Sequence, residues 1–289
     1  MKTGSYFTCR QRRRRISVLD IYQALQSRDY RNDRHKDQLH RLYEEGVTSL
    51  HTEGTVVGQV NALTVQTVGS DSFGAPTRIT ARTYMGRKGV VNIEHMVKLS
   101  GPIQHKGVLG LEGYLRGTFS QHFPLSFSCY LTFEQSYVGI EGDSASLAEL
   151  CAILSSLSEI PLRQDIAITG SINQFGEVQS VGGINDKIEG FFYICQQRGW
   201  TGEQGVIIPE TNRDSVAVIP EVSDAISKGK FHIWTVDSIG DALEILTGVP
   251  AGQASFTKDG VMQKTVFGKA YQKLKIFDQE LAKRGHIAA

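Results

Sequence analysis

The chain has 289 residues, of which 40% are hydrophobic and 21% are charged, and its formal net charge is +1. This composition is typical of a globular protein and excludes a disordered chain, while the near-zero charge favours neither nucleic acid nor a membrane surface as a partner. The four cysteines form no CxxC pair, so we expect neither a disulfide framework nor a zinc site. No apolar run approaches the ~20 residues of a membrane span. The basic N-terminus lacks the apolar stretch of a secretory signal, so we expect a cytoplasmic protein.

Residues 16–45 are dense in charge and contain neither Gly nor Pro, which predicts helix with short apolar faces. A helical segment of this size does not fold alone, so we expect it to pack on another part of the protein. The basic run RQRRRR at residues 10–15 raises the possibility of nucleic-acid binding. Basic runs are usually solvated tails and the whole chain is nearly neutral, so we do not expect nucleic acid as a partner.

From Thr55 the apolar residues follow a period of two, which predicts strands. The stretch from Thr77 to Glu94 contains GRKG between two such runs and predicts a β-hairpin. The Gly-punctuated segment HKGVLGLEGYLRGTFS, residues 105–120, is compatible with either helix or strand. The aromatic, alternating segment FPLSFSCYLTFEQSY, residues 123–137, predicts a strand.

After Ser144 helical and strand patterns alternate along the chain. Helices are predicted at 147–160, 184–199 and 238–248, and strands at 164–172, 205–209 and 231–236. The last of these helices has Ser238 as its N-cap and Gly248 as its stop. This order predicts an α/β fold with a mixed sheet of α+β character, in which the antiparallel part comes first.

Beyond Pro250 a linker leads to a basic amphipathic helix at 269–285, which we expect to be a surface appendage. These patterns divide the chain into three parts. Residues 1–45 form a helical segment, residues 46–250 the main domain, and residues 251–289 a linker and helix.

The stretch VGIEGDSASLAEL places Ser144 where a helix begins. Serine is a favoured N-cap residue, and this position alone favours that role. A nucleophile is the alternative, because the unpaired N–H groups of a helix start can bind an oxyanion and Gly142 allows a close approach of substrate. A nucleophilic serine needs a base. Only His232 and His286 follow Ser144, and neither position suits a Ser–His–Asp triad.

Lysine is the other candidate base. In GGINDKIEGFF, Lys187 stands one turn into a helix, on the apolar side beside Ile184 and Phe191. Most lysines at such positions extend to solvent. A buried amine would instead have a lowered pKa and could accept a proton near neutral pH. The spacing alone leaves both possibilities open.

Taken together, EGDSASLAEL and AITGSINQFGEVQSVGGINDKIEGFF resemble the proteolytic domain of the Lon protease family. The resemblance is closest to the LonB-like branch, whose serine motif is EGDS, and it extends over GTVVGQVNALTV and GVIIPETN, from Gly54 to Gly248. It implies a Lon-type fold and a serine endopeptidase that acts through an acyl-enzyme. Ser144 is then the nucleophile and Lys187 the general base of a Ser–Lys dyad.

The same resemblance assigns roles to neighbouring residues. It implies that the hydroxyl of Thr169 holds the lysine amine, and it places Glu141 and Asp143 on either side of Gly142 as acidic residues flanking the serine. One of these carboxylates could pair with Lys187. An ion pair keeps a lysine protonated, so we expect any such contact to be conditional.

The chain departs from full Lon proteases because it contains no GxxxxGK[ST] phosphate loop. We therefore expect no cofactor or metal in this chain, with ATP acting only through an absent or separate ATPase module. Residues 16–45 are then a possible remnant of the lid of such a module. The resemblance implies unfolded proteins or peptides as substrates and a hexameric ring as the assembly. A Lon-like ring-forming module with an inactive or occluded dyad is the alternative.

Overall fold

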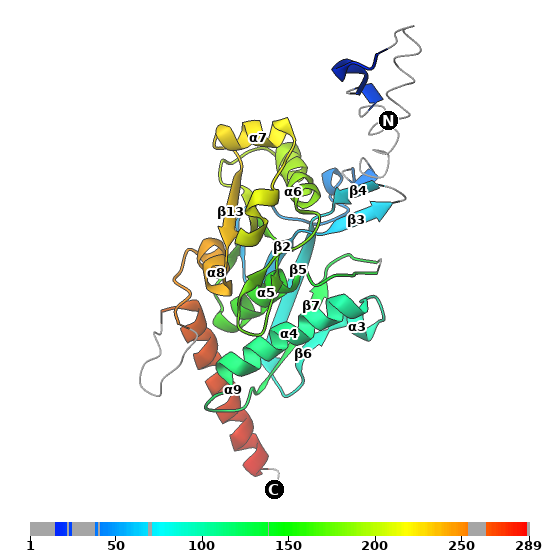
Figure 1. Ribbon diagram of the computed structural model, residues 1–289. Helices are drawn as coiled ribbons and strands as arrows, with labels where there is room; N and C mark the ends of the chain where they lie inside the picture. Colours follow the sequence, from blue (N-terminus) through cyan, green and yellow to red (C-terminus); the bar gives the residue numbers. More distant parts are fainter. Residues whose placement is uncertain are drawn as a thin grey trace.

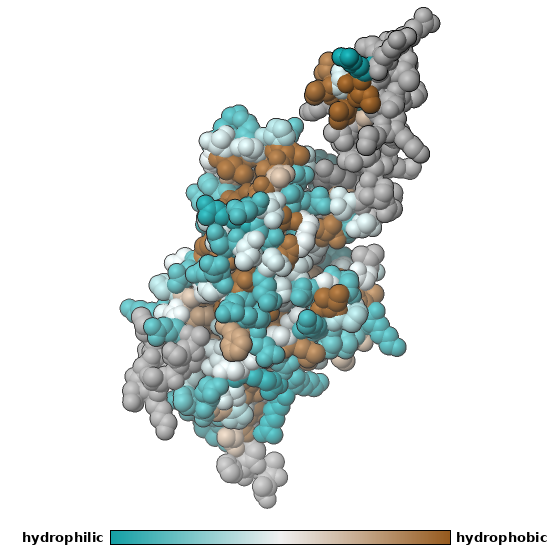
Figure 2. Space-filling model, viewed as in Figure 1, coloured by the Kyte–Doolittle hydropathy of each residue, from teal (hydrophilic) through white to brown (hydrophobic). Residues whose placement is uncertain are grey.

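The structure is a computed structural model that describes residues 15–21, 23–24, 38–39, 41–68, 71–137, 139–253 and 264–287. Half of the predicted N-terminal helix, residues 22, 25–37 and 40, lies outside these residues, as does the basic run up to residue 14. The parts of it that are described, at 18–21, 23–24, 38–39 and 41–44, are helical. Four large apolar side chains at its start are exposed (Figure 2). They are Ile16, Val18, Leu19 and Ile21.

The centre of the protein is a seven-stranded mixed sheet (Figure 1), as the sequence predicts. Its strands lie in the order β13-β12-β9-β2-β5-β7-β6. The pairs from β13 to β2 are parallel, β5 is antiparallel to both of its neighbours, and β6 is parallel to β7. The bounds are β2 Gln59–Ala62, β5 Thr77–Met85, β6 Gly89–Asn92, β7 Phe127–Phe133, β9 Ile166–Ile168, β12 Gly205–Pro209 and β13 His232–Val236.

Three short antiparallel pairs surround this sheet. They are β1 (Thr55–Val56) with β8 (Leu162–Arg163), β3 (Val65–Val68) with β4 (Asp71–Gly74), and β10 (Ser171–Ile172) with β11 (Val178–Gln179). The helices are α3 Ile93–Met96, α4 Pro102–Phe119, α5 Ser146–Ser158, α6 Ile184–Arg198, α7 Pro220–Ser227, α8 Ile239–Thr247 and α9 Val266–Ile287, with a 3-10 turn η1 at Glu210–Ser215.

Two apolar cores lie on the two faces of the sheet, because successive side chains of a strand point to opposite faces. On β12, Ile207 belongs to the first core, whereas Val206 and Ile208 belong to the second. The first core is completed by α4, α5, α8 and α9 and the second by α6 and α7. The helices cover the sheet from both sides (Figure 1).

Most helix predictions agree with the structure. The ambiguous segment 105–120 is helical up to Phe119, the last residue of α4, and Ser120 is the C-cap. Ser238 caps α8 in a reciprocal pair with Asp241, and Gly248 ends it with a φ of 66°. A left-handed backbone of this kind favours glycine.

Two predictions are wrong. Residues 77–94 do not form a hairpin, because β7 lies between β5 and β6 and pairs with both of them. The connection crosses the start of β7 at Gly86, where a Cβ would lie 2.2 Å from Ser128 Oγ. Residues 269–285 are not simply a surface appendage, because the first half of α9 belongs to the first core. Its buried side chains there are Val266, Phe267, Ala270, Tyr271 and Leu274.

Candidate active site

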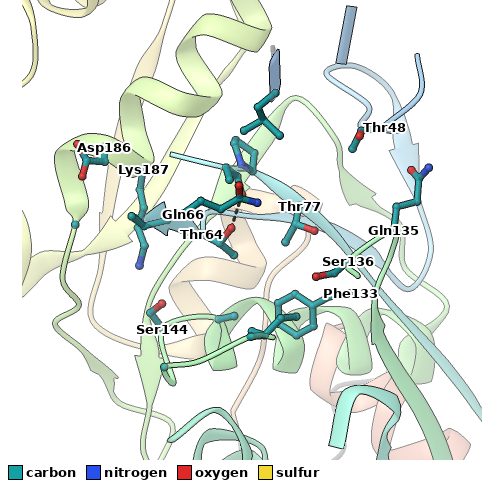
Figure 3. Close-up of a pocket in the computed structure, with 18 of the residues that line it drawn as sticks. Thr48, Thr64, Gln66, Thr77, Phe133, Gln135, Ser136, Ser144, Asp186 and Lys187 are labelled. Atoms are coloured by element: carbon teal, nitrogen blue, oxygen red, sulfur yellow. Dashed lines mark hydrogen bonds between the residues drawn. The ribbon is translucent and has the colours of Figure 1, made fainter. Parts of the chain in front are cut away.

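Ser144 and Lys187 line the same cleft, which has a volume of about 750 Å³. Figure 3 shows the two side chains at one end of it, where they extend toward one another from different elements. Ser144 precedes α5, and Lys187 lies in the first turns of α6. Two residues that are 43 positions apart in the sequence are thereby brought together.

Ser144 does not cap a helix. The N-cap of α5 is Ala145, and no side chain caps that helix end. Ser144 instead lies in a turn that follows Gly142, whose φ is 92°. The described residues include no hydrogen-bond partner for its hydroxyl. The serine oxygen is therefore available to a group that enters the cleft.

The backbone of Ser144 is nonetheless held firmly. Its carbonyl oxygen accepts hydrogen bonds from Thr169 Oγ1 at 3.0 Å and from Gly170 N at 2.9 Å. One turn later, Leu147 N donates to Gly170 O at 3.1 Å. These contacts attach the serine turn to the residues that follow β9.

Lys187 is buried, with only 3% of its surface exposed, so it does not extend to solvent. Its Nζ donates to Thr169 Oγ1 at 3.1 Å. Burial lowers the pKa of Lys187 from 10.5 to about 8, and the nearby charge of Asp143 raises it in part. An appreciable fraction of the amine is therefore neutral slightly above neutral pH.

Thr169 connects the two candidate residues. Its hydroxyl has one proton, which it donates to the Ser144 carbonyl, so its lone pairs face the Lys187 amine. Thr169 is completely buried at the end of β9. Both the serine backbone and the lysine amine are thus positioned by one side chain that directly follows β9.

The two acidic residues beside Gly142 have different partners. Glu141 Oε1 accepts a hydrogen bond from Ile103 N at 3.0 Å, at the N-terminus of α4. The Glu141 carboxylate fills the space that a side chain at Gly101 would need. Asp143 Oδ2 accepts from Ser171 Oγ at 3.1 Å. Among the described residues, neither carboxylate forms an ion pair with Lys187, so the conditional pairing stays a prediction.

His232, the histidine considered for a triad, is on β13 and does not line the cleft. Its Nε2 lies 2.8 Å from Gly202 O. Among the described residues, no three His, Cys, Asp or Glu side chains are grouped to bind a metal ion. The described helices also include none with the length and apolar character to span a bilayer.

Sequence reasoning missed one residue of the cleft, Asp186, and one buried carboxyl close to the serine turn, Glu149. Asp186 precedes Lys187, lines the cleft and accepts a hydrogen bond from Ser72 Oγ at 2.5 Å. Glu149, in the first turn of α5, is buried and accepts from Gln104 Nε2 at 2.8 Å. Burial raises its pKa to about 8. A single charge within the apolar run LAELCAIL is the signal that could have revealed it.

Comparison with known proteins gives one family. Residues 128–248 match the family model described as Lon protease (S16) C-terminal proteolytic domain. A putative Lon protease homolog of Escherichia coli (strain K12) is 44% identical over 228 residues, which are 77% of this chain and 38% of that protein. A putative Lon protease homolog of Haemophilus influenzae is 47% identical over 201 residues, which are 69% of this chain and 33% of that protein. The archaeal Lon protease of Pyrococcus abyssi is 31% identical over 196 residues, which are 68% of this chain and 18% of that protein. The chain therefore spans well under half the length of these relatives.

Proposed function

The chain contains the C-terminal proteolytic domain of the Lon protease (S16) family, and on this basis we propose that it is a serine endopeptidase with a Ser144–Lys187 dyad. The observation that carries the proposal is the buried Lys187 amine, which is linked through Thr169 to the backbone of Ser144. Both side chains open into one cleft, and this gives a peptide access to them.

In the proposed reaction the neutral Lys187 amine accepts the proton of the Ser144 hydroxyl as the serine oxygen attacks a peptide carbonyl. The resulting ammonium gives that proton to the leaving amine, and the peptide bond breaks to leave an acyl-enzyme. Water then attacks the ester carbonyl while Lys187 accepts the water proton. Return of the proton to Ser144 releases the acid product and restores the enzyme.

The turn before α5 supplies a place for the oxyanion. The N–H groups of Ser144 and Ala145 have no backbone or side-chain acceptor among the described residues. Unpaired N–H groups at a helix start carry partial positive charge, and they stabilise negative charge that develops on a substrate carbonyl oxygen. We assign them this role.

The substrates that we propose are unfolded proteins or short peptides, because the chain contains no phosphate-binding loop with which to drive unfolding by ATP. An ATPase module, if it takes part, acts from outside the described domain. A homo-oligomeric ring, hexameric by resemblance, is part of the same proposal.

The test compares wild type with Ser144→Ala and Lys187→Ala on fluorogenic peptides, with thermal unfolding as the check that each variant folds. We expect both variants to lose activity by roughly 10²-fold or more. Equal rates in all three proteins would instead identify a Lon-like module without peptidase activity. A serine-directed active-site probe followed by mass spectrometry should label Ser144 in wild type and leave Ser144→Ala unlabelled.

A further inference from the structure

The cleft extends well beyond the dyad. Figure 3 shows Ser144, Lys187 and Asp186 at one end, Thr48 and Gln135 at the other, and Thr64, Gln66 and Thr77 between them. The lining also includes five residues that precede the first strand of the domain. These are Leu39, Leu42, Tyr43, Val47 and Thr48, which we call the N-terminal wall.

The N-terminal wall is attached to the domain by specific contacts. Ser49 N donates to Gln135 Oε1 at 2.7 Å, and Gln135 Nε2 donates to Val47 O at 2.7 Å. The Gln135 side-chain amide therefore accepts from one backbone N–H and donates to one backbone carbonyl of this segment, as the backbone of a neighbouring strand would. Arg78 Nη1 adds a hydrogen bond to Ser49 Oγ at 3.1 Å.

Tyr43 joins the wall to the interior. It is only 4% exposed and packs in the second core together with Leu50. Its hydroxyl donates to Pro76 O, which also lines the cleft. The wall is therefore continuous with the core that holds α6 and Lys187.

The wall presents apolar side chains to the cleft. Leu42 is half-buried and Val47 is 55% exposed, so both have surface left to bury. Apart from tyrosines, the ionisable side chains that line the cleft are one lysine and three carboxylates. They are Lys187, Glu134, Glu141 and Asp186. The cleft thus combines the apolar side chains of the N-terminal wall with an excess of negative charge, which disfavours acidic segments of a substrate.

We propose that the N-terminal wall is a specificity subsite of the endopeptidase. Leu42 and Val47 bind an apolar side chain of the substrate that lies at a fixed distance along the peptide from the bond cleaved at Ser144. The substrate class is therefore extended peptides with an apolar residue at that separation and without acidic residues between. This inference rests on the proposed peptidase function and adds to it the residues that select among peptides.

The test uses short, internally quenched peptides of equal length with one cleavable bond, in which a single leucine is moved along an otherwise serine-containing background. We expect one narrow set of positions where leucine raises kcat/KM at least about tenfold over serine, which is the lower end of the ratio for one buried methylene group. In Leu42→Ser and in Val47→Ser this ratio should fall toward one. A matched control is Leu109→Ser, because Leu109 is 54% exposed on α4 and lies outside the cleft.

A further variant tests the attachment of the wall. Gln135→Glu keeps the side-chain shape but cannot donate to the Val47 carbonyl. We expect KM for the preferred leucine peptide to rise, while kcat changes little. A general loss of folding would lower all rates alike.

Binding of the same peptides to Ser144→Ala, measured by fluorescence anisotropy, separates the two hypotheses. The leucine peptide could bind selectively and lose this binding in Val47→Ser, while wild type hydrolyses none of the peptides. That result would contradict the proposed peptidase function but not the subsite. Hydrolysis that depends on Ser144 but shows the same leucine-to-serine ratio in wild type and wall variants would overturn the subsite.

Discussion

The two faces of the central sheet contribute to the site in different ways. The face covered by α5 supplies Ser144 through a tight turn, and α5 itself is almost entirely buried. The face covered by α6 supplies Lys187 from an amphipathic helix of which about half is buried. Because each half belongs to a separate core, Ser144 and Lys187 come together only where both cores meet the end of β9, at Thr169.

Each face also buries one ionisable side chain near the site. On α5 burial raises the pKa of Glu149 to about 8, and the nearby carboxylate of Glu94 contributes to the increase. On α6 burial lowers the pKa of Lys187 to about 8. In both cases the neutral form is favoured. The lysine lines the cleft, whereas the carboxyl lies behind the serine turn, against Gln104 of α4.

The largest expected effect is a loss of peptidase activity without a loss of stability, in a variant on the α6 face of the sheet. Lys187→Met removes the proposed base with little change in volume, so kcat/KM on peptides should fall roughly 10²–10⁴-fold. Its free energy of unfolding should stay the same or increase, because a buried amine is costly. Lys228→Met is the control, since Lys228 is exposed at the end of α7. A destabilised Lys187→Met protein would show that the amine is structural.

The next effect concerns stability against pH and distinguishes the two faces directly. Glu149 binds its proton more tightly in the folded than in the unfolded state, so its contribution to stability is complete below pH ~4.5 and is lost as the pH rises through about 8. Lys187 binds its proton less tightly when folded, so stability is regained as the pH rises from about 8 toward ~10.5. Together they place a local minimum of stability near pH 8.

Urea unfolding between pH 5 and pH 10 checks this minimum. In Glu149→Gln the decline on the acidic side should become shallower, by roughly 5 kcal/mol at most. In Lys187→Met the recovery on the alkaline side should disappear, a change of roughly 3 kcal/mol at most. Identical pH profiles for wild type and Glu149→Gln would mean that Glu149 does not stay protonated in the folded protein.

A smaller effect is expected where the two faces meet. Thr169→Val keeps the shape but removes the acceptor of the Lys187 amine and the donor to the Ser144 carbonyl. We expect kcat to fall about tenfold and the unfolding free energy to fall by about 1 kcal/mol. The ammonium loses a hydrogen bond, so the pKa of Lys187 should decrease and the pH–kcat profile should move to lower pH. Thr169→Ser should restore the wild-type profile.

Local patterns predicted most of the helices and strands after Ser144, because those elements have their own periodicity and stop signals, as at Ser238 and Gly248. They missed the short helix α7, Pro220–Ser227. They failed for residues 77–94, where strand pairing is decided by β7, which enters between β5 and β6 from a distant part of the chain. The position of α9 was missed for the same kind of reason. An amphipathic pattern shows that a helix has an apolar face but does not show what covers it.

The site was predictable only in part. The motifs named Ser144, Lys187 and Thr169, yet the same spacing around Lys187 suits a solvent-exposed lysine, so its burial is known only from the packing of α6. The N-terminal wall could not be predicted at all. Its residues come from a segment without a period-two pattern, and they reach the cleft through hydrogen bonds to Gln135, which lies far along the chain.

The smallest effect concerns the outer surface of the α5 face, where α9 packs. Lys273 Nζ of α9 lies 2.5 Å from Glu159 Oε1 at the end of α5, and the two side chains are 33% and 67% exposed. A double-mutant cycle with Lys273→Gln and Glu159→Gln should give a coupling of about 0.5 kcal/mol that decreases with salt, because exposed ion pairs are screened by water and ions. The apolar side chains Val266, Phe267 and Ala270 then account for the attachment of α9. A coupling above about 2 kcal/mol that persists at high salt would show that charge, and not burial, holds this helix on the sheet.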